Sequence, residues 1–216
     1  MCGRYSLAVN PAQVAARFSV TESAATEPNT NVTPGSTVMA IATTREGDRV
    51  ARPLRWGLVP GWAQDPKVGY KMINARAETV AEKSAYKRSF ERYRCLIPAD
   101  GFYEWYRPES GPKQPFHIAR PDGELFAFAG LWAVWHRGAP DELRTCTIIT
   151  AAANRTMAEI HDRMPAILEP EAEAAWLDPA ASAVDLLDLL HGPTDDGIVI
   201  APVSPPAPPA QGALFA

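Results

Sequence analysis

Five short segments between residues 94 and 150 constrain the fold of this chain more than any other feature. They are rich in β-branched and aromatic residues, they are separated by turns with glycine, proline or aspartate, and each is typical of a strand. Strands that follow one another this closely pair most simply as antiparallel neighbours. We therefore expect an α+β fold in which helices surround a curled, mostly antiparallel, barrel-like β-sheet. The predicted strands cover residues 94–98, 101–107, 114–119, 125–135 and 143–150.

Signals for helices lie mainly outside this strand region. Asn10 is a capping residue followed by Pro11, which predicts a helix from residue 11 to about 18. The Glu, Ala and Lys content of residues 78–90 predicts another helix, whereas residues 21–36 are polar and rich in turn formers. The other predicted elements are a hairpin of strands at 38–43 and 50–56, helices at 151–160, 170–178 and 182–190, and a last strand at 198–203.

A length of 216 residues fits one compact domain. Five prolines lie between residues 201 and 209, and proline cannot join the interior of a sheet. We therefore expect one domain over residues 1–204 and an extended or disordered proline-rich tail over 205–216.

Composition argues against several classes of protein. No stretch approaches the roughly 18 consecutive apolar residues of a membrane helix, and no signal-peptide pattern is present, so we expect a cytoplasmic protein without a membrane partner. The three cysteines, Cys2, Cys95 and Cys146, are odd in number and form no CxxC pair. This pattern argues against a disulfide framework and against a structural zinc site, and we predict no metal site.

Charge is distributed unevenly along the chain. The net charge is −4, but residues 1–107 hold 15 Lys and Arg against 10 Asp and Glu, whereas residues 108–216 hold 6 against 15. Residues 67–94 alone contain eight basic and three acidic side chains. Lys and Arg supply affinity for nucleic-acid backbones, so this segment is a candidate anion-binding surface. A solvated helix face with paired charges would give the same pattern.

Cys2 carries the most specific chemistry. Methionine aminopeptidases generally remove the initiator when the second residue is small, which would leave a free α-amine beside the Cys2 thiol. Such a 1,2-aminothiol captures aldehydes, because the amine forms an imine and the tethered thiol then closes a five-membered thiazolidine. The alternative is that Cys2 is only a small residue in a frayed terminus.

Six short sequence motifs occur in order along the chain. They are MCGRY at 1–5, NVTPG at 31–35, WGLVPGW at 56–62, NARAET at 74–79, PADGFYEW at 98–105 and IHDRMP at 160–165. Together these motifs resemble the SRAP family, and the resemblance covers roughly residues 2–204. This family is named for SOS-response-associated peptidases and is known for covalent capture of abasic sites in single-stranded DNA.

The resemblance makes Cys2 the nucleophile and places Asn74, Glu104 and His161 around it. Glu104 would accept a proton as the amine attacks or assist ring-opening of the sugar, and His161 would donate a proton to the departing hydroxyl. Asn74 would orient the terminal amine. Each residue also has an ordinary structural interpretation: a glutamate on a strand surface, a histidine after a helix, and an asparagine that caps a turn.

The resemblance also implies a DNA-binding surface. Arg4, Arg76 and Arg163 would pair with phosphates through their planar guanidinium groups. Trp62, on a turn-rich loop, would stack on a base or end the duplex beside the lesion, with core packing as the alternative. Thr150 would offer its hydroxyl and nearby N–H groups to a phosphate.

The leading hypothesis is therefore a crosslinking or lyase-type enzyme with a peptidase family name, a monomer that needs no cofactor. Its partner would be single-stranded DNA that contains an abasic site, which it would hold through a thiazolidine on Cys2 after loss of Met1. One alternative is a thiol peptidase of the N-terminal-nucleophile type. Another is a module that binds single-stranded DNA without a covalent bond. Blocking the terminal amine separates the three, because only thiazolidine formation requires that group.

Overall fold

The computed structural model describes residues 2–23 and 27–204. The tail predicted over 205–216 lies outside the described residues, so the domain boundary at residue 204 stays a prediction. Within the described part of the chain, no helix is long and apolar enough to cross a membrane.

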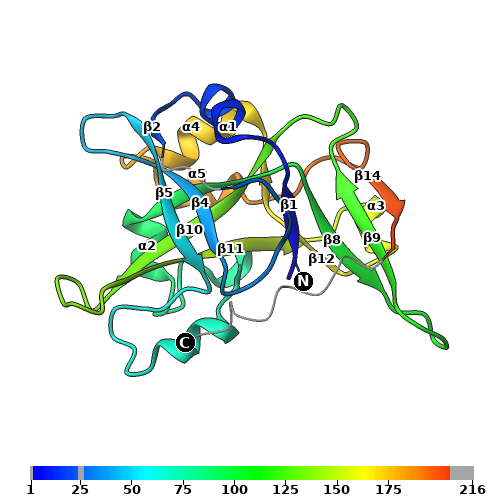
Figure 1. Cartoon of the computed structure of the whole chain (residues 1–216), viewed down its shortest axis with the longest axis horizontal. Coiled ribbons are helices and arrows are strands. Elements are labelled where there is room, and N and C mark those ends of the chain that lie inside the picture. Colours follow the sequence, from blue (N-terminus) through cyan, green and yellow to red (C-terminus); the bar gives the residue numbers. More distant parts are fainter. Residues whose placement is uncertain (1, 24–26, 205–216) are drawn as a thin grey trace.

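A closed barrel of five strands forms the centre of the molecule (Figure 1). Neighbouring strands are antiparallel in the order β11-β10-β7-β4-β5. The ring closes because β5 and β11 also pair, in parallel, at Arg55 with Thr145 and at Trp56 with Cys146. Closure leaves these strands without a free edge. The strands are β4 (Thr37–Thr43), β5 (Arg49–Trp56), β7 (Arg94–Ala99), β10 (Phe126–Trp135) and β11 (Leu143–Ala152).

Shorter strands extend this barrel sheet at its rims. β2 pairs with β5, β13 with β10, and both β6 and β12 with β11. Strand β6 is important for the site because it carries Asn74 and Arg76. The bounds are β2 (Val20–Ser23), β6 (Asn74–Arg76), β12 (Arg163–Pro165) and β13 (Ile167–Leu168).

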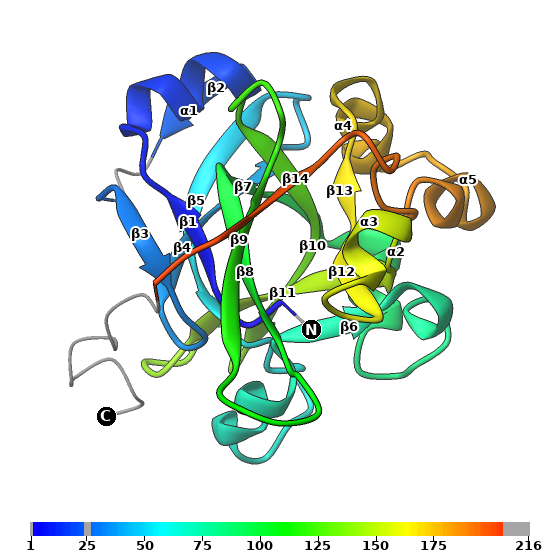
Figure 2. The ribbon, with the colours of Figure 1, turned by 90° about the vertical axis from the view of Figure 1, so that its right-hand side faces the viewer.

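A second, five-stranded sheet lies across one side of the barrel in the order β14-β9-β8-β1-β3 (Figure 2). Strand β1 begins at Tyr5, three residues after Cys2, and its neighbour β8 carries Glu104, so this sheet brings two predicted site residues near each other. Its strands are β1 (Tyr5–Leu7), β3 (Asn29–Val32), β8 (Gly101–Tyr106), β9 (Gln114–Ala119) and β14 (Val199–Pro202).

Helices are short and lie around the strands, as Figure 2 shows. The capping prediction for the first helix is confirmed, because the Asn10 side chain accepts a bond from the Gln13 N–H. The α+β, barrel-like fold class is therefore confirmed as well. The α-helices are α1 (Pro11–Phe18), α2 (Lys87–Arg92), α3 (Arg155–Ala158), α4 (Pro170–Leu177) and α5 (Ala183–Asp188), and the 3-10 helices are η1 (Pro66–Lys71) and η2 (Ala77–Thr79).

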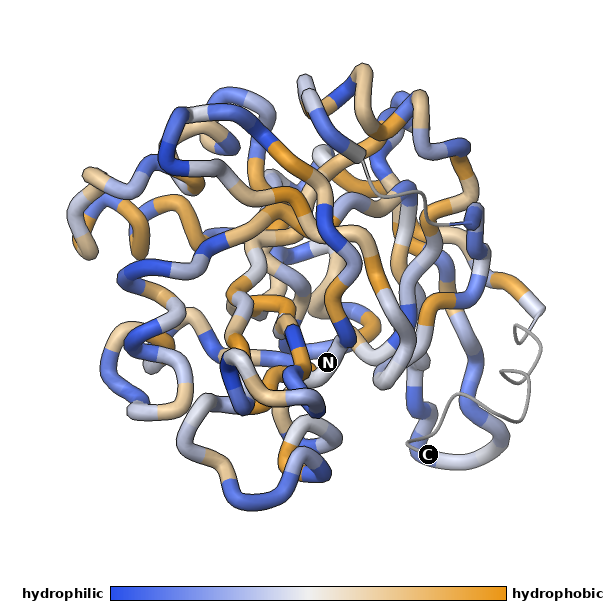
Figure 3. The backbone as a smooth tube through the Cα atoms, turned by 60° about the vertical axis from the view of Figure 1, so that its left-hand side comes forward, coloured by the Kyte–Doolittle hydropathy of each residue, from blue (hydrophilic) through white to orange (hydrophobic). Residues whose placement is uncertain are grey.

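Aromatic rings fix the second sheet onto the barrel. Tyr5 from β1 meets Trp56 edge-on at 5.4 Å and Phe128 at 5.7 Å, and Phe102 from β8 meets Phe128 at 6.1 Å. Such edge-to-face pairs add to the free energy gained from burial. The apolar segments gather in the interior strands and the hydrophilic ones in the outer loops (Figure 3). The core therefore anchors β1, and with it the segment that carries Cys2.

Two predicted helices are largely wrong. Residues 78–90 form a turn-rich segment whose α-helix begins only at Lys87. A short isolated helix is marginal, and here the chain turns so that Val80 and Tyr86 are buried. Residues 151–160 do not start a helix at 151, because β11 continues to Ala152 by pairing with β12. Only residues 155–158 are helical there.

Six of the strands were not predicted, namely β1, β2, β3, β6, β12 and β13. The polar segment 21–36 contains most of β2 and all of β3. Both lie at the ends of their sheets, where one side of each strand pairs and polar side chains are tolerated.

Candidate functional site

Cys2 lies fully buried just before β1, at the junction of the two sheets. The Asn74 side chain on β6 donates a hydrogen bond from Nδ2 to the Cys2 carbonyl, at 2.8 Å. The Tyr86 hydroxyl in turn donates to the Asn74 carbonyl, at 3.2 Å. These bonds fix the backbone of Cys2 relative to the barrel. The predicted proximity of Asn74 to Cys2 therefore matches the geometry.

The Cys2 thiol is held in its protonated form. Sγ lies 3.8 Å from the Arg4 carbonyl. Burial, and after it the nearby Glu104 carboxylate, raise the pKa of the Cys2 thiol to about 12. At neutral pH the sulfur therefore keeps its proton in this arrangement.

Glu104 reaches Cys2 because β1 and β8 are antiparallel neighbours. Tyr5 pairs with Phe102, and the Tyr103 N–H donates to the Arg4 carbonyl, at 2.9 Å. The same register, continued, sets Glu104 opposite the residues that follow Cys2. Its side chain is only 5% exposed, so it is not a glutamate on an open strand surface.

His161 lies in the turn before β12, and the two residues that follow it contact one ring nitrogen or lie within bonding distance of it. Its Nδ1 accepts a hydrogen bond from the Arg163 N–H, at 3.0 Å, so the proton of the neutral ring is assigned to Nε2. Asp162 Oδ1 lies 2.8 Å from the same Nδ1 and accepts from it when the ring is protonated. Both protonation states of His161 therefore have a partner.

A cleft of about 540 Å³ opens beside these residues. Five basic side chains line it against two acidic ones, which makes it a local cationic surface on a protein with a net charge of −4. Arg4 lies over the Trp105 ring, 5.3 Å from its centroid, so the aromatic ring also orients the guanidinium. The lining residues are Gly3, Arg4, Arg76, Glu104, Trp105, Arg107, Lys113, His161, Asp162 and Arg163.

Sequence reasoning missed Arg107 and Lys113. They flank the turn between β8 and β9, and both are exposed at the cleft. A signal was available, because Glu104 lies on the first strand of this predicted hairpin, close in sequence to its turn. The arginines of the six motifs supplied only part of the cationic lining.

Arg163 lies at the cleft, but its guanidinium is already engaged. It forms a two-pronged ion pair with Glu78, and Nη2 also donates to the Thr150 carbonyl, at 2.6 Å. The bond from Arg163 lowers the pKa of the Glu78 carboxyl. A phosphate at this position would compete with Glu78.

The predicted contact between the Thr150 hydroxyl and a phosphate is wrong for this structure. It is fully buried in β11, and its hydroxyl donates to the Ala75 carbonyl, at 3.4 Å. A phosphate cannot reach that hydroxyl in this arrangement. The position of Thr150 instead lets its carbonyl hold Arg163.

Trp62 lies outside the cleft. Its side chain is 66% exposed, so core packing does not explain it. It lines a different hollow, together with residues of α2 and of the turn between β10 and β11.

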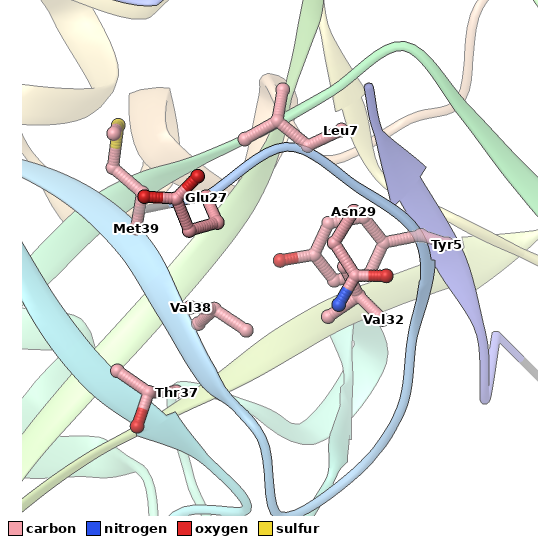
Figure 4. Close-up of a pocket in the computed structure, with 8 residues that line it drawn as sticks. All are labelled: Tyr5, Leu7, Glu27, Asn29, Val32, Thr37, Val38 and Met39. Carbon is pink, nitrogen blue, oxygen red and sulfur yellow. The ribbon is translucent and has the colours of Figure 1, made fainter. Parts of the chain in front are cut away.

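Another cavity, of about 320 Å³, lies at β1, β3 and β4 and is shown in Figure 4. Its only charged lining residue is Glu27, so it does not suit an anionic ligand. None of the predicted site residues lines it. Among residues 2–23 and 27–204 there is also no cluster of three His, Cys, Asp or Glu that would hold a metal ion.

The closed barrel, the buried Cys2 and the cationic cleft beside it together make up the candidate site. The sequence profile of the SRAP family, SOS response associated peptidase, matches residues 1–206. The chain belongs to this family.

Two named relatives align with most of this chain. The abasic site processing protein YoaM of Bacillus subtilis is 45% identical over 200 residues, which cover 90% of this chain and 87% of that protein. The abasic site processing protein HMCES of Xenopus tropicalis is 40% identical over 168 residues, 67% of this chain and 50% of that protein. A crystal structure of a protein from Bacteroides thetaiotaomicron has a TM-score of 0.87 at 25% identity, covering 94% of this chain and 93% of that one.

Proposed function

We propose that this protein captures abasic sites in single-stranded DNA through a covalent thiazolidine on Cys2, after Met1 has been removed. The observation that carries the proposal is the position of Cys2, which Asn74 holds beside a cationic cleft lined by Glu104 and His161. A cationic cleft suits the DNA backbone, and a 1,2-aminothiol suits the aldehyde of an opened abasic sugar. Two relatives named above carry the name abasic site processing protein.

The reaction divides into two balanced steps. The α-amine of Cys2 attacks the C1′ aldehyde carbon, a C–N bond forms, and the carbonyl oxygen leaves as water to give an imine. The sulfur then attacks the same carbon, and the thiol proton passes to the imine nitrogen. No oxidant or reductant is required.

The site residues divide the proton transfers between them. Glu104 accepts a proton from the attacking amine, and His161 donates one from Nε2 to the departing oxygen. Asn74 positions the Cys2 backbone rather than moving a proton, because its amide already binds the Cys2 carbonyl.

The protonated thiol favours this order over a peptidase mechanism. A thiol peptidase uses a thiolate as its first nucleophile. Here burial and Glu104 keep the proton on sulfur, with a pKa of about 12. Attack by the amine first needs no thiolate, and the tethered sulfur closes the ring afterwards.

Intact-mass spectrometry tests the proposal directly. The processed protein, incubated with a short abasic single strand, is expected to gain the mass of that strand less one water. The matched control is the same chain with Met1 retained, which keeps the thiol but lacks the free amine and is expected to give no adduct. Equal adduct yield from both preparations would show that the thiol acts without the amine.

Arg76 is expected to contribute most among the three predicted phosphate contacts. It is exposed at the cleft, whereas the guanidinium of Arg163 is engaged by Glu78. Arg76→Ala is expected to weaken binding to undamaged single strands and to flatten the plot of log affinity against log salt by about 0.7. Fluorescence anisotropy across a salt series measures both.

The control for this measurement is Arg45→Ala, in the turn between β4 and β5 away from the cleft. It removes the same charge, so it is expected to leave the slope unchanged. A wild-type slope in Arg76→Ala would exclude a phosphate contact at Arg76.

A further inference from the structure

The barrel has a second end, away from Cys2. Strands β4 and β10 finish at this end, and β5, β7 and β11 begin there, because neighbouring strands run in opposite directions. Cys2 lies toward the first end. Tyr5, which follows it in β1, meets Trp56 in the last position of β5 and Phe128 near the start of β10. A site at the second end is therefore separate from the reaction cleft.

A pocket of about 190 Å³ opens at the second end, and we call it the barrel-end pocket. All five barrel strands line it, and most lining positions share one face of the sheet. Ala42 pairs with Val50, while Cys95 pairs with Gly130, two residues before Trp132. One face of every strand in a closed barrel points inward, so the pocket is an unfilled part of the barrel interior. The lining residues are Ala40, Ala42, Thr43, Val50, Arg52, Leu54, Cys95, Trp132 and Arg144.

The interior of the barrel-end pocket is apolar. Ala40 and Ala42 present only methyl groups to it, and most of the other lining side chains are apolar as well. Cys95 is fully buried. Burial, and after it Cys146, raise the pKa of the Cys95 thiol, so this sulfur carries no charge at neutral pH. The interior therefore suits a hydrocarbon group.

Two arginines give the same pocket a cationic rim. The side chains of Arg52 and Arg144 are 40% and 57% exposed, and within the described part of the chain no Asp or Glu lines the pocket. Arg52 pairs with Glu22 at 2.8 Å, and Arg144 pairs with Glu142 at 2.9 Å. Ion pairs at a protein surface contribute little to stability, so a ligand carboxylate can displace these partners. The rim therefore suits one anionic group.

The size of the pocket narrows the class of ligand. Pockets for drug-sized molecules usually measure about 300–1,000 Å³, and they are common in the mouths of β-barrels. A pocket of about 190 Å³ in such a mouth takes a smaller molecule. An apolar interior below a cationic rim matches a molecule with one anionic head and a short apolar tail.

We propose that the barrel-end pocket binds a short-chain monocarboxylate, with its hydrocarbon tail against Ala40 and Ala42 and its carboxylate on Arg52 and Arg144. This inference goes beyond the proposed function and does not depend on it, because the lining residues of the pocket differ from those of the reaction cleft. It assigns the protein a second binding site, at the opposite end of the barrel from Cys2.

Isothermal titration calorimetry of the whole chain with octanoate, below the concentration at which octanoate forms micelles, tests the proposal. One octanoate is expected to bind per chain and to raise the melting temperature. Octanol, which lacks the charge, is expected to bind about tenfold more weakly or worse. Acetate, which lacks the tail, is expected to bind about tenfold more weakly or worse as well. No binding of octanoate, or equal binding of octanol or acetate, would overturn the proposal.

A variant that fills the pocket locates the bound octanoate. Ala42→Leu places a larger side chain in the pocket and is expected to abolish octanoate binding. Ala42→Ser is the matched control, because it leaves the space open, and it is expected to bind as the wild type does. Melting temperatures without ligand show that both variants fold. Wild-type affinity in a folded Ala42→Leu protein would place octanoate elsewhere and overturn the proposal.

A second pair of variants tests the rim and does not alter the core. Arg52→Ala/Arg144→Ala is expected to weaken octanoate binding about tenfold, because the carboxylate loses its charged donors. The control is Arg88→Ala/Arg155→Ala, which removes two exposed arginines that do not line the pocket. The control is expected to keep wild-type affinity. An equal loss in both double variants, or no loss in Arg52→Ala/Arg144→Ala, would contradict the assignment of the rim.

Discussion

Cys2→Ala is expected to lose the heat-stable DNA adduct completely. The variant keeps a terminal amine, so an imine still forms, but no sulfur closes the ring and water returns the imine to the aldehyde. The effect is large because the bond is made by one residue that is already tethered to the imine carbon. Denaturing gels after heating, with a labelled abasic strand, measure the yield.

Two substitutions sharpen this prediction. Cys2→Ser is expected to give at most a weak, labile adduct, since an oxazolidine closes less favourably than a thiazolidine. Cys95→Ala removes a different fully buried cysteine, on β7, and is expected to keep the wild-type adduct. If Cys2→Ala gave a heat-stable band at wild-type yield, another residue would have to form the bond.

Strands could be predicted from the sequence where a local run of β-branched and aromatic residues lies between clear turns. Residues 94–150 contain β-branched and aromatic runs between clear turns, and each predicted strand there is present. The parallel contact of β5 with β11 was not predictable, because Arg55 and Thr145 are far apart in sequence and no local signal encodes their pairing. That contact converts an open sheet into a closed barrel.

The helix prediction was wrong where it rested on amino-acid composition alone and not on a periodic pattern of apolar residues. Residues 78–90 are rich in helix-forming residues but lack a continuous apolar stripe, and tertiary contacts of Val80 and Tyr86 decide the path of the chain. The helix at residue 11 succeeded because Asn10 and Pro11 act locally, through a side-chain cap and a fixed φ angle.

The site was predictable as a set of residues but not as a set of contacts. The motifs pointed to Cys2, Asn74 and Glu104, and the structure brings these three together. No sequence pattern shows that Glu78 occupies the guanidinium of Arg163 or that Thr150 is buried beneath it. Those facts depend on the pairing of β11 with β6 and β12, which is a property of the whole fold.

His161→Ala is expected to slow adduct formation about a hundredfold or more, with little change in DNA affinity. General acid catalysis supplies a factor of this size, and the Nε2 proton of His161 is the one assigned to the departing oxygen. Single-turnover rates between pH 5 and 8 measure the loss. His191→Ala, an exposed histidine outside the cleft lining, is the control and is expected to react at the wild-type rate.

Glu104→Gln is also expected to slow adduct formation about a hundredfold or more. The direction of its effect on the pKa of the Cys2 thiol shows whether imine formation or ring closure limits the rate. The Glu104 carboxylate raises the pKa of the Cys2 thiol, so its replacement by a neutral amide lowers that pKa and makes thiolate more abundant. If ring closure by sulfur limited the rate, Glu104→Gln would therefore react faster than wild type. A slower reaction assigns the carboxylate to proton transfer during imine formation, and Glu109→Gln, an exposed glutamate on the same hairpin, is the matched control. A rate equal to or above wild type across pH 5 to 8 would remove Glu104 from the mechanism.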